Sequence, residues 1–140
     1  MILLALFTSI RLAVALPFSQ NVVVRDLDEK SHQGTVTWRE SFEGNACNIG
    51  AGGASVALNP YTFDTRTTGG NANNNPLCGR SLHIWNVDTG AETVATVVDR
   101  MTQDDGNAID VSPDVFAALG LSIDAGHEVV GWNLPGEFGY

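Results

Sequence analysis

Short runs rich in β-branched and aromatic residues recur along the chain from residue 34 onward. GTVTWRE (34–40), SLHIWNV (81–87) and ETVATVVD (92–99) each predict a strand. The second and third of these flank Asp-Thr-Gly-Ala, in which the Asp and the Gly favour a hairpin turn. GHEVVGWNL (126–134) predicts a closing strand. The pattern indicates a small, mainly β protein.

Two short segments predict helical structure instead. ASVALNP (54–60) is predicted to be a helical turn that Pro60 stops. Ser112 and Pro113 supply an N-cap and a proline at the first helical position, so a short helix should begin there and end at Gly120. Loops rich in Gly and Asn separate these elements. No repeat or shift in composition marks a second domain, and 140 residues fit a single domain.

The first residues have the features of an export signal. An apolar stretch precedes Ala13-Val14-Ala15, a small-x-small cleavage site, although Arg11 interrupts the apolar stretch. A short anchoring or buried helix is the alternative, but the stretch is too short and too interrupted to span a bilayer. We therefore expect a signal peptide over residues 1–15, a flexible segment over 16–33 and the folded domain over 34–140. The mature protein should be secreted and extracellular.

Composition limits the partners of the chain. Hydrophobic residues make up 44% and charged residues 16%, as in a globular protein. The net charge is −9, which disfavours nucleic acid, because phosphates are neutralised by Lys and Arg. An anionic membrane surface is disfavoured on the same ground. The three histidines are scattered and form no ligand cluster with the cysteines, so we expect neither a metal nor a cofactor. We expect a monomer.

Cys47 and Cys78 are the two cysteines of the chain. An even count in an exported protein predicts one disulfide between them. The alternative is two unrelated buried thiols.

Two aspartates lie in the apolar runs that precede the predicted helix at Pro113. Asp99 closes the predicted strand 92–99, and Asp110 stands directly before the helix start at Ser112 and Pro113. Either the two acids cap turns, or they face each other across a groove and act on a ligand. For Asp110 a helix cap or an ion pair with Arg100 is a further structural alternative.

The order of several short motifs resembles the rare lipoprotein A-like family, which includes the first domain of expansins and the fungal loosenins. The resemblance covers roughly residues 33 to 134, and no single motif is specific on its own. The matching pieces are Gly34–Trp38, Asn45–Cys47, Asn75–Gly79, Val97–Arg100 and Asp110–Phe116. The resemblance implies a single six-stranded double-psi β-barrel with one or two short helices.

The resemblance also implies a site. It places Thr37, Asp99 and Asp110 on the floor of an open polysaccharide groove, with Asp110 as the acid, Asp99 as its partner and Thr37 as a hydroxyl neighbour. Burial and a second carboxylate both favour the protonated form of such an acid, and we expect Asp99 to raise the proton affinity of Asp110. Contacts with the substrate are assigned to Trp38, Tyr61, Arg100 and Met101.

Several aromatic and loop positions keep a structural alternative. Trp38 and Tyr61 are as well explained by core packing as by stacking on sugars, and Trp85 and Trp132 are expected in the core. Met101 stands where expansins carry an aromatic residue. The loop that Met101 begins also lacks the cysteine pair of many relatives, so we expect it to be more mobile.

Three classes of function fit the sequence. The first is a non-hydrolytic, loosenin-type protein that binds and loosens cellulose, chitin or peptidoglycan. The second is a binding module for a secreted protease, because some small secreted double-psi barrels inhibit cysteine proteases. The third is a glycosidase or lytic enzyme. An inverting glycosidase needs a base roughly 6.5–9.5 Å from its acid. Glu40 is the candidate near the first strand, and it is not at the spacing that such enzymes use.

Overall fold

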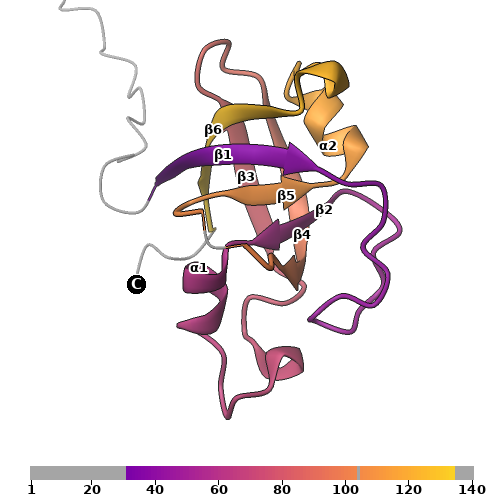
Figure 1. The fold of residues 1–140 in the computed structure, drawn as a ribbon, viewed down its shortest axis with the longest axis vertical. Coiled ribbons are helices and arrows are strands. Elements are labelled where there is room, and N and C mark those ends of the chain that lie inside the picture. Colours follow the sequence, from indigo (N-terminus) through magenta and orange to yellow (C-terminus); the bar gives the residue numbers. More distant parts are fainter. Residues whose placement is uncertain (1–30, 104, 135–140) are drawn as a thin grey trace, which may run out of the picture.

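The computed structural model describes residues 31–103 and 105–134, and the described part forms a closed six-stranded barrel (Figure 1). The strands are β1 (His32–Trp38), β2 (Ser55–Leu58), β3 (Ser81–Asn86), β4 (Glu92–Arg100), β5 (Ile109–Val111) and β6 (His127–Asn133). Two short α-helices, α1 (Pro60–Asp64) and α2 (Pro113–Ala118), and two 3₁₀ turns, η1 (Ala72–Asn74) and η2 (Ile123–Ala125), lie between them. The predicted mainly β barrel with short helices is confirmed. The predicted signal peptide lies outside the described residues.

The strand order around the barrel is β1-β5-β2-β4-β3-β6. β5 pairs in parallel with β1 and antiparallel with β2, and β2 pairs in parallel with β4. Consequently β5 enters the barrel between the two earliest strands, although β3 and β4 precede it in the chain. The connection from β1 to β2, residues 39–54, extends outward from the barrel beyond the end of β1 (Figure 1).

The core lies inside the barrel and follows the two-residue alternation of the strands. The inward side chains share full burial; among them are Val36, Val56, Leu58, Ile84, Val97, Ile109, Val111, Val130 and Trp132. Trp132 is therefore a core residue, as predicted. The expectation that Trp85 lies in the core was wrong. Its neighbour Ile84 points into the core, so alternation places the Trp85 side chain on the outer face, where it is half-buried. A Cβ on Gly131 would lie 2.2 Å from the indole, so glycine there gives Trp85 room against the backbone.

The predicted helical turn at residues 54–60 is wrong in part. Ser55–Leu58 is the strand β2, buried at all four positions because β4 and β5 pair with it on both sides. Pro60 begins α1 instead of stopping a helix, and the side chain of Asn59 caps α1 by accepting the N–H of Thr62 at 2.9 Å. An apolar run of four residues has no periodicity that distinguishes a strand from a helix.

The other predicted elements lie near their expected positions. β3 and β4 form the hairpin, and α2 begins at Pro113 after Ser112. The Ser112 hydroxyl accepts the Ser55 N–H at 3.0 Å and does not cap the helix, so it fastens the start of α2 to β2. β1 begins earlier than predicted, since His32 and Gln33 already pair with β6. The predicted flexible segment therefore overlaps the first two residues of the barrel.

Cys47 and Cys78 form the predicted disulfide, with their Cα atoms 5.5 Å apart. The bond joins the 39–54 connection to the segment that leads into β3. Both cysteines lie beside β4: the Cys47 N–H donates to the Val98 carbonyl at 3.1 Å, and the N–H of Gly79, next to Cys78, donates to the Val97 carbonyl at 2.8 Å. The disulfide thus fixes two long connections against one strand.

Replacing both cysteines by alanine should lower the free energy of unfolding by about 3–4 kcal/mol, because the bond closes a loop over a sequence separation of 31 residues. Denaturant titration of the parent and of the Cys47→Ala/Cys78→Ala double variant measures the difference. Equal midpoints would show that the barrel is independent of the bond.

Candidate functional site

Four residues form one row across four neighbouring strands: Thr37, Asp110, Ala57 and Asp99. Thr37 on β1 pairs with Asp110 on β5, Asp110 pairs with Ala57 on β2, and Ala57 pairs with Asp99 on β4. Residues paired in this way project from the same face of a sheet. Their inward neighbours are core residues, so this row faces the outside of the barrel. The structure therefore brings together the three residues that the sequence analysis assigned to the groove floor.

A β-bulge brings Asp99 into this row. Val56 pairs with Val97, but the next pair is Ala57 with Asp99, so Val98 is an extra residue in β4. Val98 packs outside the barrel with Phe42 and Ala57. If the regular pairing continued past Val97, Val98 would pair with Ala57, and Asp99 would be opposite Leu58 and would point into the core.

Arg39 is a residue of the site that the sequence analysis missed. Its guanidinium lies between the two carboxylates: Nη2 donates to Asp99 Oδ2, and Nε lies 3.2 Å from Asp110 Oδ2 as an ion pair without hydrogen-bond geometry. The guanidinium also stacks over the Phe42 ring at 4.1 Å. Arg39 follows Thr37 by two residues, and its N–H still pairs with Val111 of β5 at 3.0 Å. Alternation from Thr37 was the signal that could have identified it.

Asp99 is buried and held by several donors. Besides Arg39, its Oδ1 accepts the N–H of Ala46 at 2.7 Å and that of Arg100 at 2.8 Å. Only 12% of its side chain is exposed. Asp99 therefore fixes Arg39 and the 39–54 connection, and its oxygens are occupied.

Asp110 is the more available of the two acids. Its Oδ1 accepts the Thr37 hydroxyl at 3.1 Å, and 17% of its side chain is exposed. Burial raises the pKa of Asp110 above its ordinary value, and Asp99 adds a smaller contribution. The charge of Arg39 and the hydrogen bond from Thr37 act in the opposite direction without cancelling the effect of burial. The pKa of Asp110 is raised as expected, and of the two expected causes burial is the larger and the charge of Asp99 the smaller.

A hollow of about 200 Å³ opens above Asp110. It is lined by Thr37, Arg39, Met101, Thr102, Gln103 and Asp110. Hydroxyl, amide, guanidinium and carboxyl groups here offer both donors and acceptors, which suits the hydroxyls and ring oxygens of a sugar. Met101 lies at this hollow, as expected from its position, and no described aromatic ring lines it.

The other predicted contact residues lie elsewhere. Tyr61 on α1 is 72% exposed and does not line this hollow. Trp38 packs against the core, and its Nε1 donates to the Ile123 carbonyl at 3.3 Å. Arg100 makes a two-pronged ion pair with Asp64 at 2.7 and 2.6 Å, so the cation beside Asp110 is Arg39.

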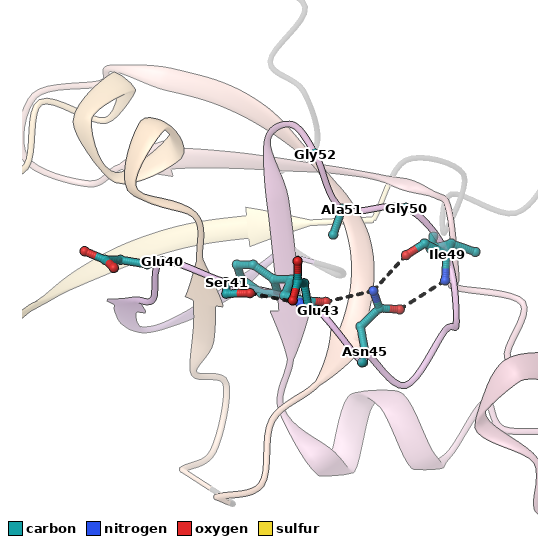
Figure 2. A pocket seen from close by; sticks show the side chains of 10 residues that line it. Glu40, Ser41, Glu43, Asn45, Ile49, Gly50, Ala51 and Gly52 are labelled. Carbon is teal, nitrogen blue, oxygen red and sulfur yellow. Dashed lines mark hydrogen bonds between the residues drawn. The ribbon is translucent and has the colours of Figure 1, made fainter.

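Glu40 lines a second hollow, of about 480 Å³, formed by the 39–54 connection (Figure 2). It is absent from the lining of the hollow above Asp110. Within residues 31–103 and 105–134, no group of three His, Cys, Asp or Glu side chains could hold a metal ion. No helix in the same part of the chain is long and apolar enough to cross a membrane.

Solved structures share this architecture. The Streptomyces papain inhibitor is 26% identical, with a TM-score of 0.63 over 75% of this chain and 94% of its own. A variant of the Clavibacter michiganensis expansin in complex with cellohexaose is 18% identical, with a TM-score of 0.57 over 74% of this chain and 50% of its own. The apo expansin is 19% identical, with a TM-score of 0.56 over 79% of this chain and 52% of its own. The chain thus spans about half the length of the expansins.

No protein-family model and no curated protein sequence matches the chain. At under 25% identity the expansin matches establish the fold alone, and the closed mixed barrel agrees with them. The chain has the double-psi β-barrel fold that the resemblance implied.

Asp110→Asn should increase the free energy of unfolding at neutral pH. Because the pKa of Asp110 is raised in the folded state, the folded protein binds the proton more tightly than the unfolded chain, and the ionised carboxylate costs stability. The gain should shrink as the pH falls through the pKa of Asp110. Thermal unfolding measured from neutral pH to below the pKa of Asp110 tests this gain in stability. The control is Asp88→Asn, because Asp88 lies in an exposed turn. A pH-independent difference between Asp110→Asn and parent would contradict the expectation.

Arg39→Met keeps an aliphatic stem for packing on Phe42 but leaves Asp99 without its cation. The free energy of unfolding should fall by about 1.5–3 kcal/mol, the range for hydrogen bonds to charged groups. The pKa of Asp110 should rise further, because the charge of Arg39 lowers it. NMR titration of the carboxyl carbon measures this second effect. Arg100→Met, which removes the exposed pair with Asp64, should leave the pKa of Asp110 unchanged.

Proposed function

We propose that this chain is a secreted, non-hydrolytic polysaccharide-binding protein of the loosenin type. The observation that carries the proposal is the Thr37–Asp110 pair at the floor of the hollow, with Arg39 beside it. A carboxyl group with a raised pKa can donate a hydrogen bond to a glycosidic oxygen, while Thr37 and Arg39 contact neighbouring hydroxyls. The complex of an expansin variant with cellohexaose, on the same fold, supports a polysaccharide as the ligand.

The arrangement of carboxylates supports binding without hydrolysis. Glycosidases of the usual kind place two carboxyl groups on opposite sides of the scissile bond. Here the partner of Asp110 is Asp99, whose oxygens are engaged by Arg39, Ala46 and Arg100. Glu40 belongs to another hollow. Among the described residues, the hollow above Asp110 thus offers one acid without a free base to activate water.

Binding to a secreted cysteine protease is a second candidate. The observation that favours it is the 26% identity to the Streptomyces papain inhibitor, which extends over 94% of that protein. The same disulfide-bonded barrel would then present its loops to an enzyme. The two functions are separable by experiment, because one predicts binding to polysaccharide and the other predicts inhibition of a protease.

Asp110→Ala should reduce binding to an insoluble polysaccharide about five- to tenfold, because it removes a central polar contact. Sedimentation with cellulose, chitin and peptidoglycan measures the bound fraction, and reducing sugars are assayed in the supernatant. Binding of the parent should increase as the pH falls toward the pKa of Asp110. Asp110→Asn should bind more weakly and independently of pH in this range, while Asp88→Asn should behave as the parent.

Unchanged binding by Asp110→Ala would remove the hollow as the binding site. Release of sugars by the parent would favour the glycosidase or lytic alternative. Failure of the parent to bind any of the three polymers would overturn the polysaccharide proposal.

A further inference from the structure

The 39–54 connection carries an outer segment, residues 49–53, that is anchored at its first residue. Asn45 fastens its start with three hydrogen bonds: Nδ2 donates to the Phe42 carbonyl at 2.9 Å and to the Ile49 carbonyl at 2.8 Å, and Oδ1 accepts the Ile49 N–H at 3.2 Å (Figure 2). The Ala46 N–H binds Asp99, and Cys47 is disulfide-bonded. Ala51 packs inward against Phe42, Ala57 and Val98. The segment is thus held by the packing of Ala51 and by the hydrogen bonds of Ile49.

Neither backbone conformation nor packing requires glycine at three positions of this segment. Gly50, Gly52 and Gly53 do not occupy the left-handed region of backbone space. A Cβ on any of them would meet nothing within 4 Å. Glycine costs conformational entropy on folding, so alanine would serve the fold better at these positions. Close approach by another molecule is a remaining reason to leave this backbone bare.

The main chain of residues 50–52 and the side chain of Ile49 are available to a partner. Within the described part of the chain, the N–H and carbonyl groups of residues 50–52 take part in no backbone hydrogen bond. The Ile49 side chain is 38% exposed beside them. Unpaired main-chain groups next to an exposed apolar side chain are the features by which a partner recognises a peptide segment.

The segment also forms one wall of the hollow of about 480 Å³ (Figure 2). Glu40 and Glu43 also line this hollow, and the described lining includes no cation. A sugar chain would find few side-chain donors here. A protein cleft that forms hydrogen bonds with the main chain does not need side-chain donors.

We propose that the 49–53 segment inserts into the substrate cleft of a papain-type cysteine protease. Ile49 fills an apolar subsite, and the absence of side chains at Gly50, Gly52 and Gly53 lets the walls of the cleft reach the main chain. The proposal rests on the protease-binding function given above as the second candidate. The Asn45 bonds and the disulfide keep the segment ordered before binding, which lowers the entropy lost on association.

The test measures inhibition of papain, with a fluorogenic peptide substrate, by the full mature chain. Ile49→Ala and the double variant Gly50→Ala/Gly52→Ala should each raise the inhibition constant about tenfold or more. Ile123→Ala is the matched control, because Ile123 is 42% exposed on η2, and it should inhibit as the parent does. Thermal unfolding verifies that every variant is folded, and the glycine variant should be at least as stable as the parent.

Each outcome is decisive. If the parent inhibits and the segment variants inhibit equally well, the segment is not the contact surface, while protease binding stands. If the parent does not inhibit papain, both the second function and this inference are overturned. If the segment variants lose binding to cellulose or chitin and keep inhibition, the segment is a polysaccharide contact and the inference is wrong.

Discussion

One extra residue in β4 determines which face of the barrel carries Asp99. Side chains alternate along a strand, so a shift by one residue exchanges inside for outside. The bulge at Val98 keeps Val97 in the core and still turns Asp99 outward, level with Ala57 and Asp110. The contacts that Asp99 makes with Arg39 and with the Ala46 N–H therefore depend on this local departure from regular pairing.

Arg39 gives the two acids different properties although they share one guanidinium. Asp99 binds it by a hydrogen bond and also accepts two backbone N–H groups, so its oxygens are satisfied. Asp110 keeps an ion pair without hydrogen-bond geometry and a single bond from Thr37. Burial then dominates, and the pKa of Asp110 rises despite the adjacent cation. One acid is a structural anchor and the other faces the hollow.

The parts of the fold that depend on local pattern could be predicted from the sequence. The hairpin of β3 and β4 and the start of α2 at Pro113 follow from turn and cap residues. The error at β2 arose because its burial comes from β4 and β5, which the local sequence does not reveal. The bulge and the position of Arg39 depend likewise on pairing between distant strands. The resemblance identified Thr37, Asp99 and Asp110 as residues of the site. It assigned Arg100 to the groove as well, but Arg100 binds Asp64, and this contact depends on the tertiary structure.

The hollow above Asp110 and the 49–53 segment share Asp99 as a common support. Through Arg39 this carboxylate borders the hollow, and through the Ala46 N–H it holds the connection that carries the segment. Loss of Asp99 would thus disturb both surfaces and could not assign a function to either. Asp110 contacts the hollow, while Ile49 and Gly50 belong to the segment. Because these positions have no common hydrogen-bond partner, their effects on binding should be nearly additive, and the two proposed activities can be tested separately in one molecule.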